Sequence, residues 1–164
     1  TYEGEILLGV ETNSQDTDGE ITSEKDPSGV TEEQLRTEMK AALGDQMQMP
    51  PMVSAIKMNG VPLYKLARKG QEVEREPRFI HIYKFALHEF NPPRVTFEVK
   101  STKGTYVRTL AHDLGQRLGC GACLSQLRRT QSGDFNLSKA WKLDDIVKWD
   151  RAELEKNLIP IHAI

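Results

Sequence analysis

The sequence has few aromatic residues, only two cysteines and no long apolar stretch. Aromatic residues make up 7% of the 164 residues, so we expect one globular domain with a mainly aliphatic core. No apolar run approaches the roughly 18 residues of a transmembrane helix. No signal-peptide pattern opens the chain. We therefore expect a cytoplasmic protein that neither spans a membrane nor is secreted by the usual route.

The two cysteines, Cys120 and Cys123, form a Cys-x-x-Cys pair between glycines. No second pair and no nearby histidine pair accompanies them, which argues against zinc and predicts no metal site. Two reduced cysteines are the expected state in a cytoplasmic protein. A redox role for the pair stays open as an alternative.

Charge is distributed unevenly although the formal net charge is only −2. Residues 1–45 hold 3 basic against 12 acidic residues, a balance of −9. Residues 50–84 hold 7 against 3, or +4, and residues 94–130 hold 7 against 2, or +5. A basic band of this kind attracts phosphate backbones. A solvated surface is the ordinary alternative.

Apolar periodicity predicts helices interleaved with hairpin-like strands. Residues 2–12 alternate as a strand does, residues 13–29 form a polar acidic loop, and Thr31 opens a helix with a capping box. Residues 122–129 are expected to form a second short helix or turn. The pattern predicts an α+β fold with a mixed, largely antiparallel sheet and flanking helices.

The segment around Lys103 and Gly104 is expected to be an elbow between a strand and a helix. Residues 95–100 alternate apolar and polar, and apolar residues then recur at helical spacing from Val107 until Gly119. Tyr106 and Arg108 fall in the first turn, where free N–H groups and the helix dipole favour an anion. The alternative is an ordinary amphipathic helix with a core tyrosine and a surface arginine.

Four motifs carry a resemblance to a known family: Pro50–Lys57, Gly60–Gly70, Lys103–Thr109 and Leu118–Thr130. They closely resemble the TruB family of tRNA pseudouridine synthases, in its bacterial form. The resemblance implies a partial pseudouridine synthase catalytic domain over residues 1–164, with residues 50–78 as an inserted thumb that grips RNA, and no PUA-like tail. The implied activity is isomerisation of uridine 55 in the T loop of tRNA, without metal or cofactor.

The resemblance also implies which residues matter. The family uses one catalytic aspartate in a Gly-x-Leu-Asp loop, and this chain has no such motif; its own aspartates stand in acidic loops or helix caps. We therefore expect a truncated, proteolysed or split enzyme, inactive alone, whose missing N-terminal segment is a possible partner. Arg108 matches the arginine that pairs with this aspartate. Tyr2 matches the tyrosine that stacks on the uracil. Tyr106 and Leu127 match residues that line the pocket.

RNA contacts are expected from the thumb and the neighbouring body of the domain, through phosphates rather than bases. The candidates are Lys57, Tyr64, Lys65, Arg68, Lys69, Arg128 and Arg129. Val53 departs from the family, where many relatives carry an aromatic residue. A non-catalytic module that binds or folds RNA on the same scaffold is the alternative function.

Overall fold

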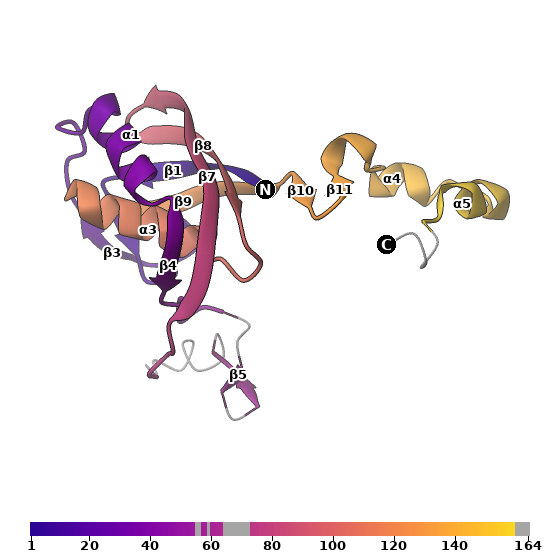
Figure 1. Ribbon diagram of the computed structural model, residues 1–164, viewed down its shortest axis with the longest axis horizontal. Helices are drawn as coiled ribbons and strands as arrows, with labels where there is room; N and C mark the ends of the chain where they lie inside the picture. Colours follow the sequence, from indigo (N-terminus) through magenta and orange to yellow (C-terminus); the bar gives the residue numbers. More distant parts are fainter. Residues whose placement is uncertain (55–56, 59, 64–72, 160–164) are drawn as a thin grey trace. The chain divides into compact units, whose positions relative to one another are not determined.

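The computed structural model describes residues 1–54, 57–58, 60–63 and 73–159, which divide into two compact units, 1–129 and 130–164. Each unit is described by itself. The first contains β1 (Tyr2–Leu8), β2 (Val10–Thr12), β3 (Ile21–Glu24), α1 (Glu32–Ala41), β4 (Gly44–Gln48), β5 (Lys57–Met58), β6 (Val61–Pro62), β7 (Arg78–Asn91), β8 (Arg94–Ser101), α3 (Val107–Leu118) and β9 (Ala122–Arg129) (Figure 1).

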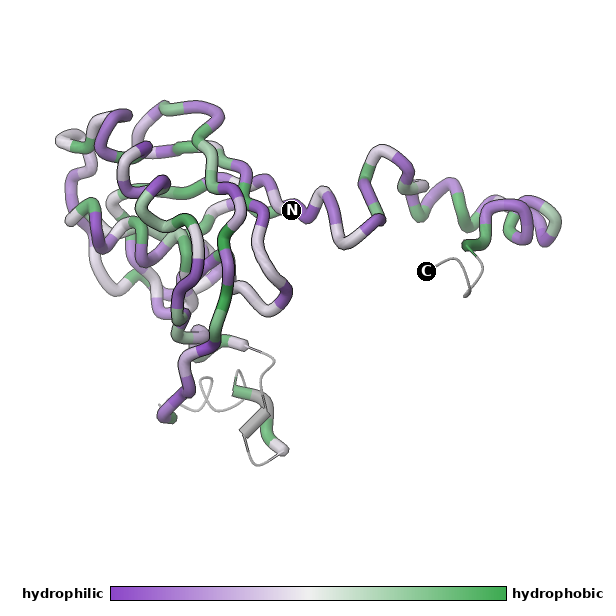
Figure 2. Tube along the Cα trace, viewed as in Figure 1, coloured by the Kyte–Doolittle hydropathy of each residue, from purple (hydrophilic) through white to green (hydrophobic). Residues whose placement is uncertain are grey.

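A five-stranded sheet in the order β4-β7-β8-β1-β9 forms the centre of the first unit. Every neighbouring pair in it is antiparallel. Buried and exposed residues alternate along β8, because successive side chains point to opposite faces of a sheet. The same alternation of hydrophobic and hydrophilic residues along the strands can be followed in Figure 2. The predicted α+β class is confirmed.

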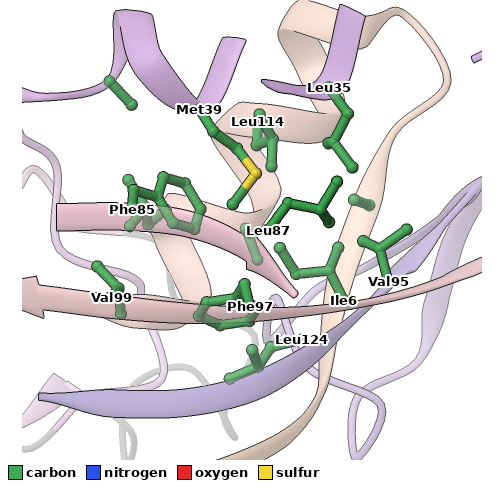
Figure 3. Close-up of a cluster of buried hydrophobic side chains, with 14 of the residues drawn as sticks. Ile6, Leu35, Met39, Phe85, Leu87, Val95, Phe97, Val99, Leu114 and Leu124 are labelled. Carbon is green, nitrogen blue, oxygen red and sulfur yellow. The ribbon is translucent and has the colours of Figure 1, made fainter. Parts of the chain in front are cut away.

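The core lies between one face of this sheet and the two long helices (Figure 3). Leu35 and Met39 of α1 and Leu114 of α3 pack over strand residues such as Ile6 and Phe97, all at most 2% exposed. Burying one such side chain contributes roughly 1.5–3 kcal/mol. Aliphatic residues dominate the cluster, as the composition predicts.

The start and end of α3 follow from two glycines and one tyrosine. Gly104, at φ +86°, makes the predicted elbow after β8, and Gly119, at φ +80°, is the left-handed residue that ends the helix. Tyr106 is the N-cap rather than a residue of the first turn, and its side chain makes no capping bond. The capping box of α1 between Thr31 and Gln34 is confirmed.

Two sequence-based expectations are wrong. Residues 122–129 form β9, not a helix or turn, because they pair antiparallel with β1, with one shift of register, and cover its open edge. Residues 13–29 are not simply a solvated loop, because Ile21–Glu24 form β3 against β2 and residues 15–17 bond to Leu124 of β9.

The second unit contains short elements without a buried residue among those described. A hairpin of β10 (Gln131–Ser132) and β11 (Phe135–Asn136) leads to a 3-10 turn, α4 (Leu143–Ile146) and α5 (Arg151–Asn157). Trp141 and Trp149 pack edge to face, with ring centroids 5.0 Å apart. None of the helices that the structure describes is long and apolar enough to cross a lipid bilayer.

Candidate active site

Arg108, the second residue of α3, holds three separate segments of the chain together. Its Nη1 donates to Oδ2 of Asp16 at 2.8 Å and to the carbonyl of Ser14 at 3.1 Å, and its Nη2 donates to the carbonyl of Val53 at 2.7 Å. Its side chain is only 22% exposed. Hydrogen bonds from a charged group contribute about 1.5–3 kcal/mol each when they are shielded from water. The guanidinium is therefore oriented, and does not point into bulk solvent.

The loop that carries Asp16 is itself fixed to the edge of β9. Asp16 forms a parallel bridge with Leu124, whose N–H and carbonyl also bond to the residues on either side of Asp16. The second carboxylate oxygen of Asp16 accepts from the Ser14 hydroxyl and from the N–H of Asp18. Both oxygens thus have protein donors, so Asp16 is suited to hold Arg108 rather than to attack a substrate.

Thr109 adds a further tie between α3 and the same loop. Its buried hydroxyl donates to the side chain of Gln15 at 2.7 Å. Gln15 has φ +66°, in the left-handed region that non-glycine residues rarely adopt. The neighbouring bonds of Ser14 and Asp16 to Arg108 hold this backbone turn in place, so the loop and the helix support each other's geometry.

Tyr106 is fixed through its backbone by a residue at the end of β4. The amide of Gln48 accepts from the N–H of Tyr106 at 2.8 Å and donates to its carbonyl at 3.1 Å. Gln48 is 4% exposed. Nothing in its local sequence marked it as part of a site, since its partner is 58 residues away.

Tyr2 belongs to β1, an inner strand of the sheet between β8 and β9. It is partly buried and packs against the core, and it stands opposite Val99 on one side and Arg129 on the other. Asp16 bridges β9 opposite Ile6, four residues further along β1, or about 13 Å at roughly 3.3 Å per residue. Tyr2 and Arg108 thus come from separate elements, with no hydrogen bond between them in the described part of the chain.

Leu127, Arg128 and Arg129 lie at the far end of β9. Leu127 stands opposite Gly4 and is 45% exposed, so its side chain is accessible and could line a substrate pocket. Arg128 and Arg129 are exposed. Their exposure is compatible with contacts to phosphate, and their role stays a prediction.

The thumb is described only in part. Tyr64, Lys65, Arg68 and Lys69 lie outside the described residues, as does most of the short helix expected there. The backbone of Lys57 belongs to β5, which pairs with β6. At the base of the thumb, Nη1 of Arg75 donates to the carbonyl of Pro50 at 2.9 Å, joining the two ends of the insertion.

One sequence-based interpretation needs correction here. Asp16 was grouped with aspartates in acidic loops, yet it is the acidic partner of Arg108 within this chain. Val53 bonds to Arg108 through its backbone carbonyl, so this bond does not depend on the side chain at this position, whose departure from the family stays as the sequence indicated. That the catalytic aspartate lies outside the chain stays a prediction.

Cys120 and Cys123 are not among the described residues that bond to Arg108. Cys120 and Cys123 are free and buried, and burial raises the pKa of both thiols above the ordinary value. A raised pKa lowers the thiolate fraction and hence reactivity, which disfavours a redox role. Among the residues described, no cluster of three His, Cys, Asp or Glu side chains could hold a metal ion.

Comparison with known proteins places this geometry in context. Residues 1–107 match the TruB family pseudouridylate synthase N-terminal domain, and residues 108–164 match the tRNA pseudouridylate synthase B C-terminal domain. The chain is 56% identical over 161 residues to tRNA pseudouridine synthase B of Opitutus terrae, covering 98% of this chain and 67% of that protein. It is 50% identical over 144 residues to the protein of that name from Geotalea uraniireducens, covering 88% and 46%.

Solved structures of complexes contain chains with a similar fold. A Cbf5–Nop10–Gar1 complex contains a chain with a TM-score of 0.66 and 27% identity, covering 96% of this chain and 38% of that one. An H/ACA ribonucleoprotein bound to RNA containing 2′-deoxyuridine gives 0.60 and 23%, covering 99% and 37%, and supports the fold alone. The chain thus spans two thirds of one curated relative and about half of the other.

Proposed function

Since the chain belongs to the TruB family of pseudouridylate synthases, we propose that it forms most of the catalytic domain of an enzyme that isomerises uridine to pseudouridine in tRNA. The proposed substrate is the T arm, with uridine 55 of the T loop as the target. The observation that carries the proposal is the oriented, partly buried Arg108 in a chain with these relatives.

The reaction breaks the bond between N1 of uracil and C1′ of ribose, and forms a bond from C5 to C1′. The proton on C5 is lost and N1 gains one, so no metal or redox cofactor is required by the balance. An ionised carboxylate must be held close to the sugar and base. A guanidinium favours that ionised form and orients it through paired N–H donors.

Arg108 retains donors for such a carboxylate. Its Nε–H and one N–H on Nη2 have no acceptor in the part of the chain that the structure describes. We assign these donors to a catalytic aspartate from a segment upstream of Tyr2. Asp16 then acts as the positioning partner, and keeps the guanidinium fixed when the second acid is present.

Aromatic and apolar residues would receive the base once it leaves its stack. Tyr2 would stack on the uracil and assist removal of the C5 proton, and Tyr106 and Leu127 would line the pocket. Lys57, Tyr64, Lys65, Arg68 and Lys69 of the thumb, and Arg128 and Arg129 of β9, would contact the RNA backbone. Binding should therefore weaken steeply with salt.

The test compares the chain alone with the chain joined to the upstream segment of its gene. The substrate is a T-arm RNA with tritium on C5 of the target uridine, and tritium release reports isomerisation. The joined protein should turn over and the chain alone should not. Arg108→Lys should abolish turnover, because a single ammonium cannot reach Asp16, the carbonyls of Ser14 and Val53 and a second acid with the spread, planar donors of a guanidinium.

Arg117→Lys is the matched control. Arg117 lies on the same helix and pairs with Glu38 at 3.5 Å, away from the loop that carries Asp16. It should keep wild-type turnover. Absence of tritium release from the joined wild-type protein would overturn the enzymatic proposal, and salt-sensitive RNA binding without turnover would favour the non-catalytic module.

A further inference from the structure

Gln48 connects the base of the thumb to the first turn of α3. It is the last residue of β4, just before Pro50 opens the thumb, and its side chain is buried. Both polar atoms of its amide bond to the backbone of Tyr106. Two residues beyond Tyr106, Arg108 bonds to the carbonyl of Val53 in the same thumb base.

These two hydrogen bonds require a side chain that can accept and donate at once, as the neutral amide of Gln48 does. Tyr106 is the N-cap, and the N–H groups at the start of a helix have no acceptor within the helix, so its own N–H depends on an external acceptor. Its carbonyl already accepts the N–H of Leu110 within the helix, and Gln48 donates to the same oxygen. An ionised carboxylate could accept but not donate, and an apolar side chain could do neither. The apolar change leaves the N–H of Tyr106 without its acceptor, and the ionised carboxylate places a negative oxygen against a carbonyl oxygen to which it cannot donate.

Gln46 provides an internal comparison on the same strand. It lies two residues earlier, on the same face of β4, and its amide donates to the carbonyl of Ala42 at 2.9 Å. That carbonyl belongs to the C-cap of α1. The two glutamines therefore tie β4 to two different helix ends, and only Gln48 reaches the helix that carries Arg108.

We infer that Gln48 is a positioning residue for the reaction: it holds the start of α3 in register with the thumb base, and so sets where the guanidinium of Arg108 points. The inference rests on the proposed function. Reacting groups misplaced by about 1 Å can lose about 100-fold in rate, although binding of the rest of the substrate continues. Gln48 acts through Tyr106 and Arg108 and does not touch the substrate itself.

The test uses the joined protein and T-arm RNA, with Gln48→Met against Gln46→Met as the matched control. Gln48→Met should lower kcat by about 10- to 100-fold while KM changes by less than about threefold. Gln46→Met should keep wild-type kcat and KM. In the chain alone, amide hydrogen exchange at Tyr106 should accelerate in Gln48→Met and stay unchanged in Gln46→Met.

Gln48→Glu adds a readout that does not depend on removing the side chain. A protonated carboxyl can accept from the N–H of Tyr106 and donate to its carbonyl, and burial raises the pKa of such a group. The ratio of its kcat to the wild-type kcat should therefore rise as the pH is lowered from about 8.5 to about 6. A defect caused by a change in side-chain shape alone would not depend on pH.

The outcomes separate this inference from the proposed function. An inactive joined wild type overturns both. An active wild type with Gln48→Met at wild-type kcat overturns the inference alone, as does unchanged exchange at Tyr106 or a pH-independent ratio for Gln48→Glu. A fall in kcat that appears equally in Gln46→Met also overturns it, because the effect would then belong to β4 in general.

Discussion

The ion pair between Arg108 and Asp16 should couple the two residues more strongly than an exposed pair can. Their side chains are 22% and 23% exposed, and the shortest N–O distance is 2.8 Å. Exposed pairs are worth about 0.2–1 kcal/mol, whereas shielded hydrogen bonds to a charge are worth about 1.5–3 kcal/mol. For a pair with this intermediate exposure we expect a coupling free energy of about 1–2 kcal/mol.

A double-mutant cycle measures this coupling. The variants are Arg108→Met, Asp16→Asn and the double variant, and the assay is urea unfolding of the chain, monitored by circular dichroism. Arg108→Met alone should cost about 2–4 kcal/mol of unfolding free energy, because it also leaves the carbonyls of Ser14 and Val53 without their donor. Equal urea m-values are needed for the free energies to be compared.

Arg36 and Glu32 supply the control cycle. They form an i,i+4 pair at 2.7 Å on α1, with side chains 53% and 49% exposed. Their coupling should be about 0.3–0.5 kcal/mol. If the cycle for Arg108 and Asp16 gives no larger coupling than this pair, the guanidinium is not held as the structure indicates, and the argument for an oriented arginine fails.

Three further predictions concern packing, pH and thiol reactivity. Gly115→Ala should lower the unfolding free energy by about 1–3 kcal/mol, since its Cβ would lie 2.2 Å from a backbone nitrogen of β9, whereas Gly29→Ala, in open space, should stay within about 0.5 kcal/mol of wild type. The hydrogen bond from Lys84 of β7 lowers the pKa of Glu98, so the stability that this carboxylate contributes is present above its unfolded pKa and is lost as the pH falls. The difference in unfolding free energy between wild type and Glu98→Gln, measured in urea, should be full at about pH 7 and shrink below about pH 4. Cys120 and Cys123 should react slowly with iodoacetamide at neutral pH in the native chain and rapidly in guanidinium, and fast native labelling would revive the redox alternative.

Local pattern was sufficient to predict the elements whose boundaries depend on local chemistry. The capping box at Thr31, the elbow at Gly104 and the helix end at Gly119 all depend on residues within one turn of each other. The strand nature of residues 122–129 depends instead on pairing with β1, more than a hundred residues away. Ala, Cys, Leu and Ser there have no strong strand preference, so tertiary pairing decided the outcome.

The candidate site shows the same division. Arg108 and Tyr106 could be selected because they occupy a recognisable elbow, and the resemblance gave them roles. Asp16 could not, because an acidic residue between polar neighbours is typical of a solvated loop. The bonds of this loop to Leu124 of β9 bring it to α3, across a separation of 92 residues between the two ends of the ion pair.

The first turn of α3 is held by partners from three other parts of the chain. The loop at 14–16, the end of β4 and the base of the thumb each contribute to it. Helix propensity alone would place Arg108 on α3 but would leave its long side chain free to rotate. Ordering that side chain costs up to about 2 kcal/mol of conformational entropy. The hydrogen bonds to these partners offset this entropy loss when the chain folds. Because the carbonyl of Val53 is one of these partners, we expect a displacement of residues 50–54 to alter the orientation of Arg108 as well.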